Sequence, residues 1–167
     1  MRHRSLSILI FGFLVGLFAI GTAVKAVEDP NSGTWKMNTA KSKYDPGPAP
    51  TSSTTTIESD ENKYKVDAHT VNADGTETHI SFDAKTDGKD YPLSGVPSAD
   101  RISVKRVGAK TIETTWKKDG KTVMKTHAVV SSDGKTRTVT FDGTDSKVTK
   151  YIMLSCLKKG CESGSRI

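Results

Sequence analysis

The stretch KYKVDAHTVNADGTETHISFDAK, residues 63–85, decides the fold. In its first half, Tyr64 and Val66 alternate with charged residues. In its second half, Ile80 and Phe82 alternate with polar residues in the same way. A period of two with one apolar face is typical of a β-strand that buries one side. The two halves are therefore expected to pair as an antiparallel hairpin.

The turn between these halves sets which residues face each other. A three-residue loop over 73–75, with Gly75 at the positive-φ position, keeps Ala68 opposite Ile80 on the apolar face. A slip of one residue would send every side chain to the other face. The sequence thus predicts one register for this hairpin.

That register places His69 directly across from His79 on the polar face, with Cβ atoms about 5 Å apart. Two neutral imidazoles at that spacing could share a zinc or copper ion, with Asp67 or Glu77 as a further ligand. The alternative is a pair of exposed polar residues on an outer face that binds nothing.

The same rhythm continues along the chain. Asp-Gly, a dipeptide that favours tight hairpin turns, occurs five times, at 74–75, 87–88, 119–120, 133–134 and 142–143. Strands are expected near 33–38, 52–59, 62–71, 76–85, 89–93, 100–107, 110–117, 121–131, 135–142 and 146–156. No stretch after residue 27 has a convincing helical period. The prediction is an all-β domain, a single antiparallel up-and-down β-barrel of about ten strands; the alternative is a β-sandwich.

The N-terminus has the three parts of a secretion signal. Arg2 and Arg4 precede an apolar run over 6–20, and small residues at 24–26 offer a cleavage site. We expect a signal peptide over 1–26 and export to the periplasm or the medium. The alternative is an uncleaved membrane anchor, because the uncharged stretch is just long enough to span a bilayer.

Removal of that segment leaves one domain over 27–167, in which no later segment could span a membrane. The whole chain carries a net charge of +6, and three of its 25 basic residues but none of its 19 acidic residues lie in the signal. The exported part would carry +3, with lysines scattered singly. That pattern argues against a nucleic-acid partner.

Two cysteines, Cys156 and Cys161, flank Gly160 near the C-terminus. In an oxidising compartment a disulfide that closes this short loop is the leading hypothesis. Two free thiols are the alternative, and no further ligands for a zinc site are visible nearby.

No catalytic motif is present: the chain has no nucleophile elbow, no glycine-rich phosphate loop and no metalloprotease helix motif. Most acidic residues fall in turns, where they support backbone geometry. The prediction is a protein that is not an enzyme and needs no cofactor.

Residues that point inward by alternation would line any cavity of the barrel. The candidates for ligand binding are Tyr64, Phe82, Trp116, Arg137, Phe141 and Tyr151. Arg137 shares a face with Val139 and Phe141, which would make it an inward charge suited to an acidic ligand group. Alternatively, it lies near the hairpin end and reaches solvent.

One segment breaks the strand rhythm. Residues 45–50 place proline at alternate positions, which forbids a helix and favours an extended path, after a possible helical turn around 40–44. This segment is either a flap over the barrel mouth or a stiff linker between two strands.

The opening of the first strand, Gly33-Thr34-Trp35, resembles the Gly-x-Trp start of the calycins, the lipocalins and fatty-acid-binding proteins. In that family the glycine and tryptophan begin strand one and the tryptophan closes the barrel floor, which implies structural roles for Gly33 and Trp35. The longer string over 33–50 is similar to a group of exported bacterial proteins of unassigned activity. The resemblance implies a calycin barrel that binds a small ligand.

The chain also departs from the fatty-acid-binding pattern. The prolines leave no room for a helical lid of normal length, and the last strand lacks the paired arginine and tyrosine that hold a ligand carboxylate. Tyr151 could match that tyrosine, but Thr149 stands at the basic position.

Three functions remain open. The first is an extracytoplasmic protein that binds a small apolar or weakly acidic molecule. The second is an envelope module for protein interaction or inhibition, with a filled core and an unknown partner. The third is a metal-binding protein that uses the histidine pair.

Overall fold

The computed structural model describes residues 28–44, 48–143 and 146–156, the last of these as backbone. Within that part of the chain lie ten strands and one 3-10 turn, η1 (Thr39–Lys41). The strands are β1 (Gly33–Met37), β2 (Ser52–Ser59), β3 (Lys63–Val71), β4 (Glu77–Lys85), β5 (Asp87–Pro92), β6 (Arg101–Gly108), β7 (Thr111–Lys118), β8 (Lys121–Val130), β9 (Thr136–Gly143) and β10 (Ser146–Cys156).

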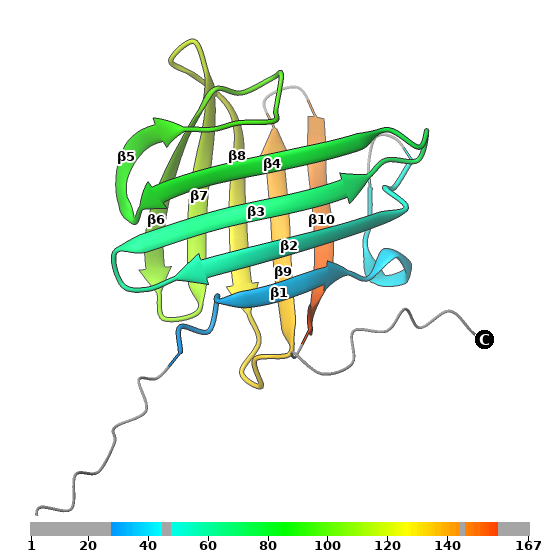
Figure 1. The fold of residues 1–167 in the computed structure, drawn as a ribbon, viewed down its shortest axis with the longest axis horizontal. Helices are drawn as coiled ribbons and strands as arrows, with labels where there is room; N and C mark the ends of the chain where they lie inside the picture. The colour runs from blue at the N-terminus through cyan, green and yellow to red at the C-terminus, as the bar shows by residue number, and fades with distance from the viewer. Residues whose placement is uncertain (1–27, 45–47, 144–145, 157–167) are drawn as a thin grey trace, which may run out of the picture.

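The strands form one antiparallel sheet in the order β4-β3-β2-β1-β10-β9-β8-β7-β6-β5. The first and last strands pair with each other, and β1 to β4 cross in front of the later strands, so the sheet rolls onto itself (Figure 1). At its two ends, β4 meets the loop after β5 through an isolated bridge between Ser81 and Ser94. The architecture is the predicted all-β up-and-down barrel and not a β-sandwich.

That closing bridge depends on a close approach of two backbones. Ser81 and Ser94 each donate a backbone hydrogen bond to the other, at 3.2 and 3.1 Å. Gly95 follows at φ +87°, and a Cβ added there would lie 1.7 Å from the carbonyl oxygen of His79. Glycine is therefore required where the loop seals the β4 edge.

The hairpin that the sequence singled out forms in the predicted register. Ala68 pairs with Ile80 and His69 with His79, without a register shift along β3 and β4. Gly75 adopts φ +82° in the turn, as its three-residue loop requires.

Two details of the strand prediction were wrong. Asp142-Gly143 was expected to form a turn, but β9 continues through Gly143. β5 begins at Asp87 and not at residue 89, because a register shift between Asp87 and Asp90 lets β6 pair across the expected turn. In both places backbone pairing to a neighbouring strand extends the ladder into a local turn signal.

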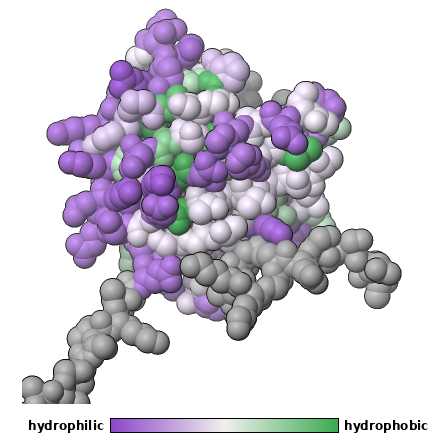
Figure 2. All heavy atoms as spheres, viewed as in Figure 1, coloured by the Kyte–Doolittle hydropathy of each residue, from purple (hydrophilic) through white to green (hydrophobic). Residues whose placement is uncertain are grey.

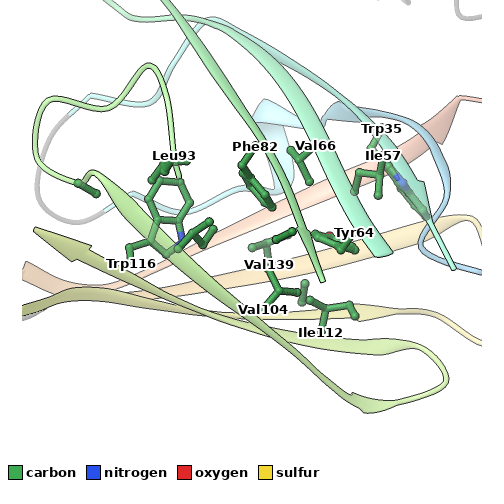
Figure 3. Packing of buried hydrophobic residues seen from close by; sticks show 14 of the residues in the cluster. Trp35, Ile57, Tyr64, Val66, Phe82, Leu93, Val104, Ile112, Trp116 and Val139 are labelled. Atoms are coloured by element: carbon green, nitrogen blue, oxygen red, sulfur yellow. The ribbon is translucent and has the colours of Figure 1, made fainter. Parts of the chain in front are cut away.

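The alternating apolar residues meet inside the barrel (Figure 3). The largest fully buried side chains include Trp35, Tyr64, Ile102 and Ile112, which come from four different strands. Removal of this much apolar surface from water is the main stabilising term of the fold.

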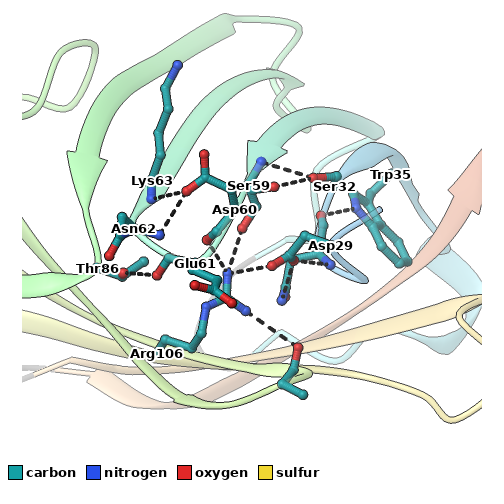
Figure 4. A network of polar contacts seen from close by, with 12 residues as sticks. Asp29, Ser32, Trp35, Ser59, Asp60, Glu61, Asn62, Lys63, Thr86 and Arg106 are labelled. Carbon is teal, nitrogen blue, oxygen red and sulfur yellow. Dashed lines mark hydrogen bonds and ion pairs between the residues drawn. The ribbon is translucent and has the colours of Figure 1, made fainter. Parts of the chain in front are cut away.

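Trp35 lies near one end of the barrel, as the calycin resemblance implied, and is 1% exposed. Its indole Nε1 donates to the carbonyl oxygen of Asn31 at 3.1 Å. Beside it, Arg106 forms an ion pair with Asp29, with 2.7 Å between Nη2 and Oδ2 (Figure 4). We call these four residues and their contacts the floor network.

Arg106 also ties the floor network to the turn after β2. Its Nη2 donates to Ser59 Oγ and to the carbonyl oxygen of Asp60, both at 2.8 Å. The side chains of Arg106 and Asp29 are 18% and 13% exposed. This end of the barrel is thus sealed by polar groups that belong to the protein itself.

The outer surface is largely hydrophilic on the face drawn in Figure 2. Among the described residues, Val107 and Val129 are the large hydrophobic side chains that are exposed, and they lie on separate strands. No helix in the described part of the chain has the length and apolar character needed to cross a membrane. The expected signal over 1–26 and the expected Cys156–Cys161 disulfide lie outside the described residues or side chains.

Candidate functional site

The barrel interior contains a cavity of about 280 Å³ that opens to solvent. One wall comes from β2, β3 and β4 and the other from β6 to β9. Five of the six predicted ligand-binding residues line it: Tyr64, Phe82, Trp116, Arg137 and Phe141. The sixth, Tyr151, pairs through its backbone with Val139, a cavity residue, and its side chain is not among those described.

Arg137 points into the barrel and is 6% exposed. Alternation along β9 puts it on the face of Val139 and Phe141, so the inward orientation is confirmed and the solvent-facing alternative is wrong. Its Nη2 donates a hydrogen bond of 2.7 Å to the hydroxyl of Tyr64, across the barrel on β3. Its Nε is buried, and no group among the described residues accepts from it.

No carboxylate of the described residues forms an ion pair with Arg137. A buried guanidinium cannot lose its proton to escape the cost of burial. An unpaired charge in an apolar interior is costly, and buried charges in proteins are normally paired. Arg137 is therefore a buried charge without a countercharge among the described residues.

Tyr64 completes this end of the cavity. It is 2% exposed, and burial raises its pKa above the ordinary value, although the guanidinium of Arg137 acts in the opposite direction. The phenol is thus neutral at physiological pH, so it accepts from Arg137 and keeps its own proton. Together the two side chains carry a net charge of +1 and spare hydrogen-bond donors.

A second polar group lies on the wall formed by β6 to β9, which also carries Arg137. Trp116 Nε1 donates to Thr114 Oγ1 at 2.8 Å, and Thr114 Oγ1 lies 2.7 Å from Thr126 Oγ1. These two bonds use two of the three hydrogens that the group carries on nitrogen and oxygen. One hydroxyl hydrogen remains for a further acceptor.

The two polar groups stand apart along the barrel. Thr126 pairs with Phe141, whereas Arg137 lies four residues earlier on the same strand. Four residues of β-strand span roughly 13 Å. Between the two groups the wall is apolar, and the rings of Phe82 and Tyr64 lie 6.2 Å apart between centroids.

Sequence reasoning missed the residues at the cavity's other rim: Met37, Pro50, Asn72 and Thr78. The alternation of β3 and β4 continues to the hairpin tip, from Ala68 to Asn72 and from Ile80 back to Thr78. Continuing that alternation to the hairpin ends of both strands would have identified Asn72 and Thr78. Met37 and Pro50 carried no such signal.

Pro50 bears on the proline-rich segment. It lines the cavity, so this end of the segment does more than link two strands. Before it, η1 provides the single helical turn that was expected, though centred a little earlier, and Tyr44 donates to the Sδ of Met37 at 2.8 Å. Residues 45–47 lie outside the described part.

The histidine pair lies outside the cavity. His69 and His79 are exposed on the outer face of β3 and β4, and Asp67 joins them. Glu77, the other expected helper, pairs with Val71 at the hairpin end and is not part of this group.

Comparison with known proteins identifies the fold of the chain. No protein-family model matches the chain, and no curated protein matches it in sequence. Solved structures of the fluorescent protein UnaG do match: the wild type and a mutant each have 19% identity and a TM-score of 0.54, covering 77% of this chain and 98% of that one. The fold is therefore calycin-like, as the Gly-x-Trp resemblance predicted.

Proposed function

We propose that this protein binds a small, mainly apolar molecule with one acidic group in the barrel cavity. The observation that carries the proposal is Arg137, a buried guanidinium on the cavity wall with no carboxylate partner among the described residues. An anionic ligand would supply the missing countercharge and an acceptor for Nε.

The cavity also indicates the size and shape of the ligand. Its volume of about 280 Å³ lies at the lower edge of the range for small-molecule sites, roughly 300–1,000 Å³. The apolar wall between the two polar groups favours a hydrophobic body. A ligand with an acid at Arg137 and a weak acceptor near Thr126 would satisfy both.

A location outside the cytoplasm belongs to the same proposal. The signal-like N-terminus supports export, after which the barrel would meet its ligand in the periplasm or the medium. The cavity favours this hypothesis over that of an interaction module with a filled core.

Two fluorescent probes with the same rings test the proposal. 1-Anilinonaphthalene-8-sulfonate carries a sulfonate, and N-phenyl-1-naphthylamine lacks it. Arg137→Met should weaken binding of the sulfonate by about tenfold or more, because a hydrogen bond to a charged group is worth roughly 1.5–3 kcal/mol. Binding of the neutral probe should change by less than about twofold, since its apolar contacts remain.

The matched control is Arg101→Met, which removes an exposed arginine from β6 outside the cavity. It should leave both dissociation constants unchanged. Equal loss of both probes in Arg137→Met, or equal loss of the sulfonate in both variants, would contradict the proposal.

A further inference from the structure

The outer face of β3 and β4 gathers three metal-ligating side chains. Asp67 and His69 come from β3 and His79 from β4, and their ligand atoms all lie within 4.8 Å of one another. All three point away from the barrel interior, so this cluster is separate from the cavity and has no part in the proposed ligand site.

The two imidazole rings are arranged alike. They stack with centroids 4.1 Å apart and planes 11° from parallel, because the residues stand directly opposite each other in the ladder. Each ring turns its Nε2 toward the same carboxylate. Nε2 of His79 lies 2.7 Å from Oδ2 of Asp67, and Nε2 of His69 lies 3.4 Å from Oδ1.

A cation fits where the three side chains meet once the two rings turn out of their stack, because each Nε2 lone pair lies in the plane of its ring. A neutral imidazole offers one lone pair on nitrogen, and two lone pairs with one carboxylate form a set that suits zinc or copper.

We propose that Asp67, His69 and His79 form a surface site for Zn²⁺ or Cu²⁺. Two Nε2 atoms and one carboxylate oxygen bind the ion, and water takes the remaining position, as in sites with three protein ligands. Imidazole nitrogen excludes Mg²⁺ and Ca²⁺ as preferred occupants, since these take oxygen ligands. Cu²⁺ binds more tightly than Zn²⁺, following the general order for divalent ions.

The backbone beneath the site is fixed and the side chains above it are accessible. The β3–β4 ladder runs through nine residue pairs without a register shift, so the three Cα positions are set by the sheet. The side chains of His69, His79 and Asp67 are 65%, 51% and 47% exposed. An ion can therefore enter and leave readily, and small side-chain rotations bring the ligand atoms together.

Metal titration of the full chain, purified without a histidine tag, tests the site. Isothermal calorimetry with ZnCl₂ and with CuSO₄ in a non-coordinating buffer should show that one equivalent of metal binds. His79→Ala and His69→Ala should each weaken the affinity by at least about tenfold, because even the loss of a residue that only supports a metal ligand costs about that much. CaCl₂ in excess should not compete.

The matched control is His127→Ala, which removes an exposed histidine from β8, opposite Glu113, on another part of the outer face. It should leave both affinities unchanged. His3 is present in every variant, so its contribution cancels in the comparison.

A measurement on the unaltered chain guards against variants that fail to fold. Substoichiometric Cu²⁺ should broaden the imidazole NMR signals of His69 and His79 before that of His127. The site is disproved by equal broadening of all three, or by metal affinities that are the same in His79→Ala, His127→Ala and the unaltered chain. Retained binding of the sulfonate probe by His79→Ala would show that the two sites are independent.

Discussion

Arg106 and Arg137 both point into the barrel, and they differ in the groups that pair with their guanidinium charges. In the floor network, Arg106 is 2.7 Å from the carboxylate of Asp29 and donates to two further oxygens. In the cavity, Arg137 donates to the neutral hydroxyl of Tyr64 and has no carboxylate partner among the described residues. Both side chains have a buried Nε without an acceptor, so the difference lies in the countercharge.

The two arginines differ in whether a carboxylate of the described residues pairs with them. A buried ion pair whose partners belong to the same chain holds two segments together, here the residues before β1 and strand β6. A buried charge without such a partner weakens the fold unless something from outside pairs with it. The floor network thus closes the barrel, while Arg137 is the residue that we propose to pair with a ligand.

Removal of the floor countercharge should have the largest effect on stability. Asp29→Ala leaves Arg106 as an unpaired charge and is expected to lower the free energy of unfolding by about 3 kcal/mol, the lower end for broken buried pairs. Urea denaturation followed by tryptophan fluorescence measures this. The double variant Asp29→Ala/Arg106→Met should recover part of the loss; a loss of less than about 1 kcal/mol in Asp29→Ala would remove the structural role.

The cavity wall also contains a paired group, and its partner should matter for stability too. Thr114→Val leaves the indole N–H of Trp116 buried without an acceptor, which should cost about 1–3 kcal/mol. Thr126→Val keeps that acceptor and should cost less than Thr114→Val in the same urea experiment. The reverse order would show that the indole does not depend on Thr114.

Arg137→Met should alter stability least among these variants, by less than about 1 kcal/mol. The lost hydrogen bond to Tyr64 is offset by removal of a buried charge that has no carboxylate partner among the described residues. The same variant should bind the sulfonate probe more weakly than the unaltered chain does. A loss of stability as large as that of Asp29→Ala would mean that the two arginines are alike, and would end the distinction drawn between them.

Moderately alkaline pH should not change the affinity of the cavity for the sulfonate probe. Burial raises the pKa of Tyr64, so the phenol keeps its proton up to at least its ordinary value of about 10, and the pair with Arg137 keeps its charge of +1. The dissociation constant of the sulfonate probe should stay flat from about pH 7.5 to about pH 9.5. Weakening over this range that Tyr64→Phe abolishes would show that a tyrosinate neutralises Arg137.

Local patterns made much of the fold predictable from sequence. The period of two in residues 63–85 and the turn chemistry at Gly75 fixed the hairpin register, because both act between near neighbours. The same alternation offered an inward position for Arg137 and left a solvent-facing one open. The Asp-Gly turn signal failed at Asp142-Gly143, where pairing with a neighbouring strand continues β9 through Gly143.

The floor network and the closing bridge could not be predicted in this way. Asp29 and Arg106 meet because the whole sheet rolls up, and no spacing in the sequence records that contact. The approach of Gly95 to His79 likewise depends on where the sheet ends meet. Which charge has a carboxylate partner is thus decided by tertiary structure.

The most direct test is the ¹⁵N NMR signal of each arginine Nε–H during titration with 1-anilinonaphthalene-8-sulfonate. The account predicts that the Nε–H resonance of Arg137 shifts in proportion to probe bound, as it gains an acceptor, while that of Arg106 stays in place. Saturation of the probe site with the Arg137 resonance unmoved would contradict the claim that this buried arginine receives the acidic group.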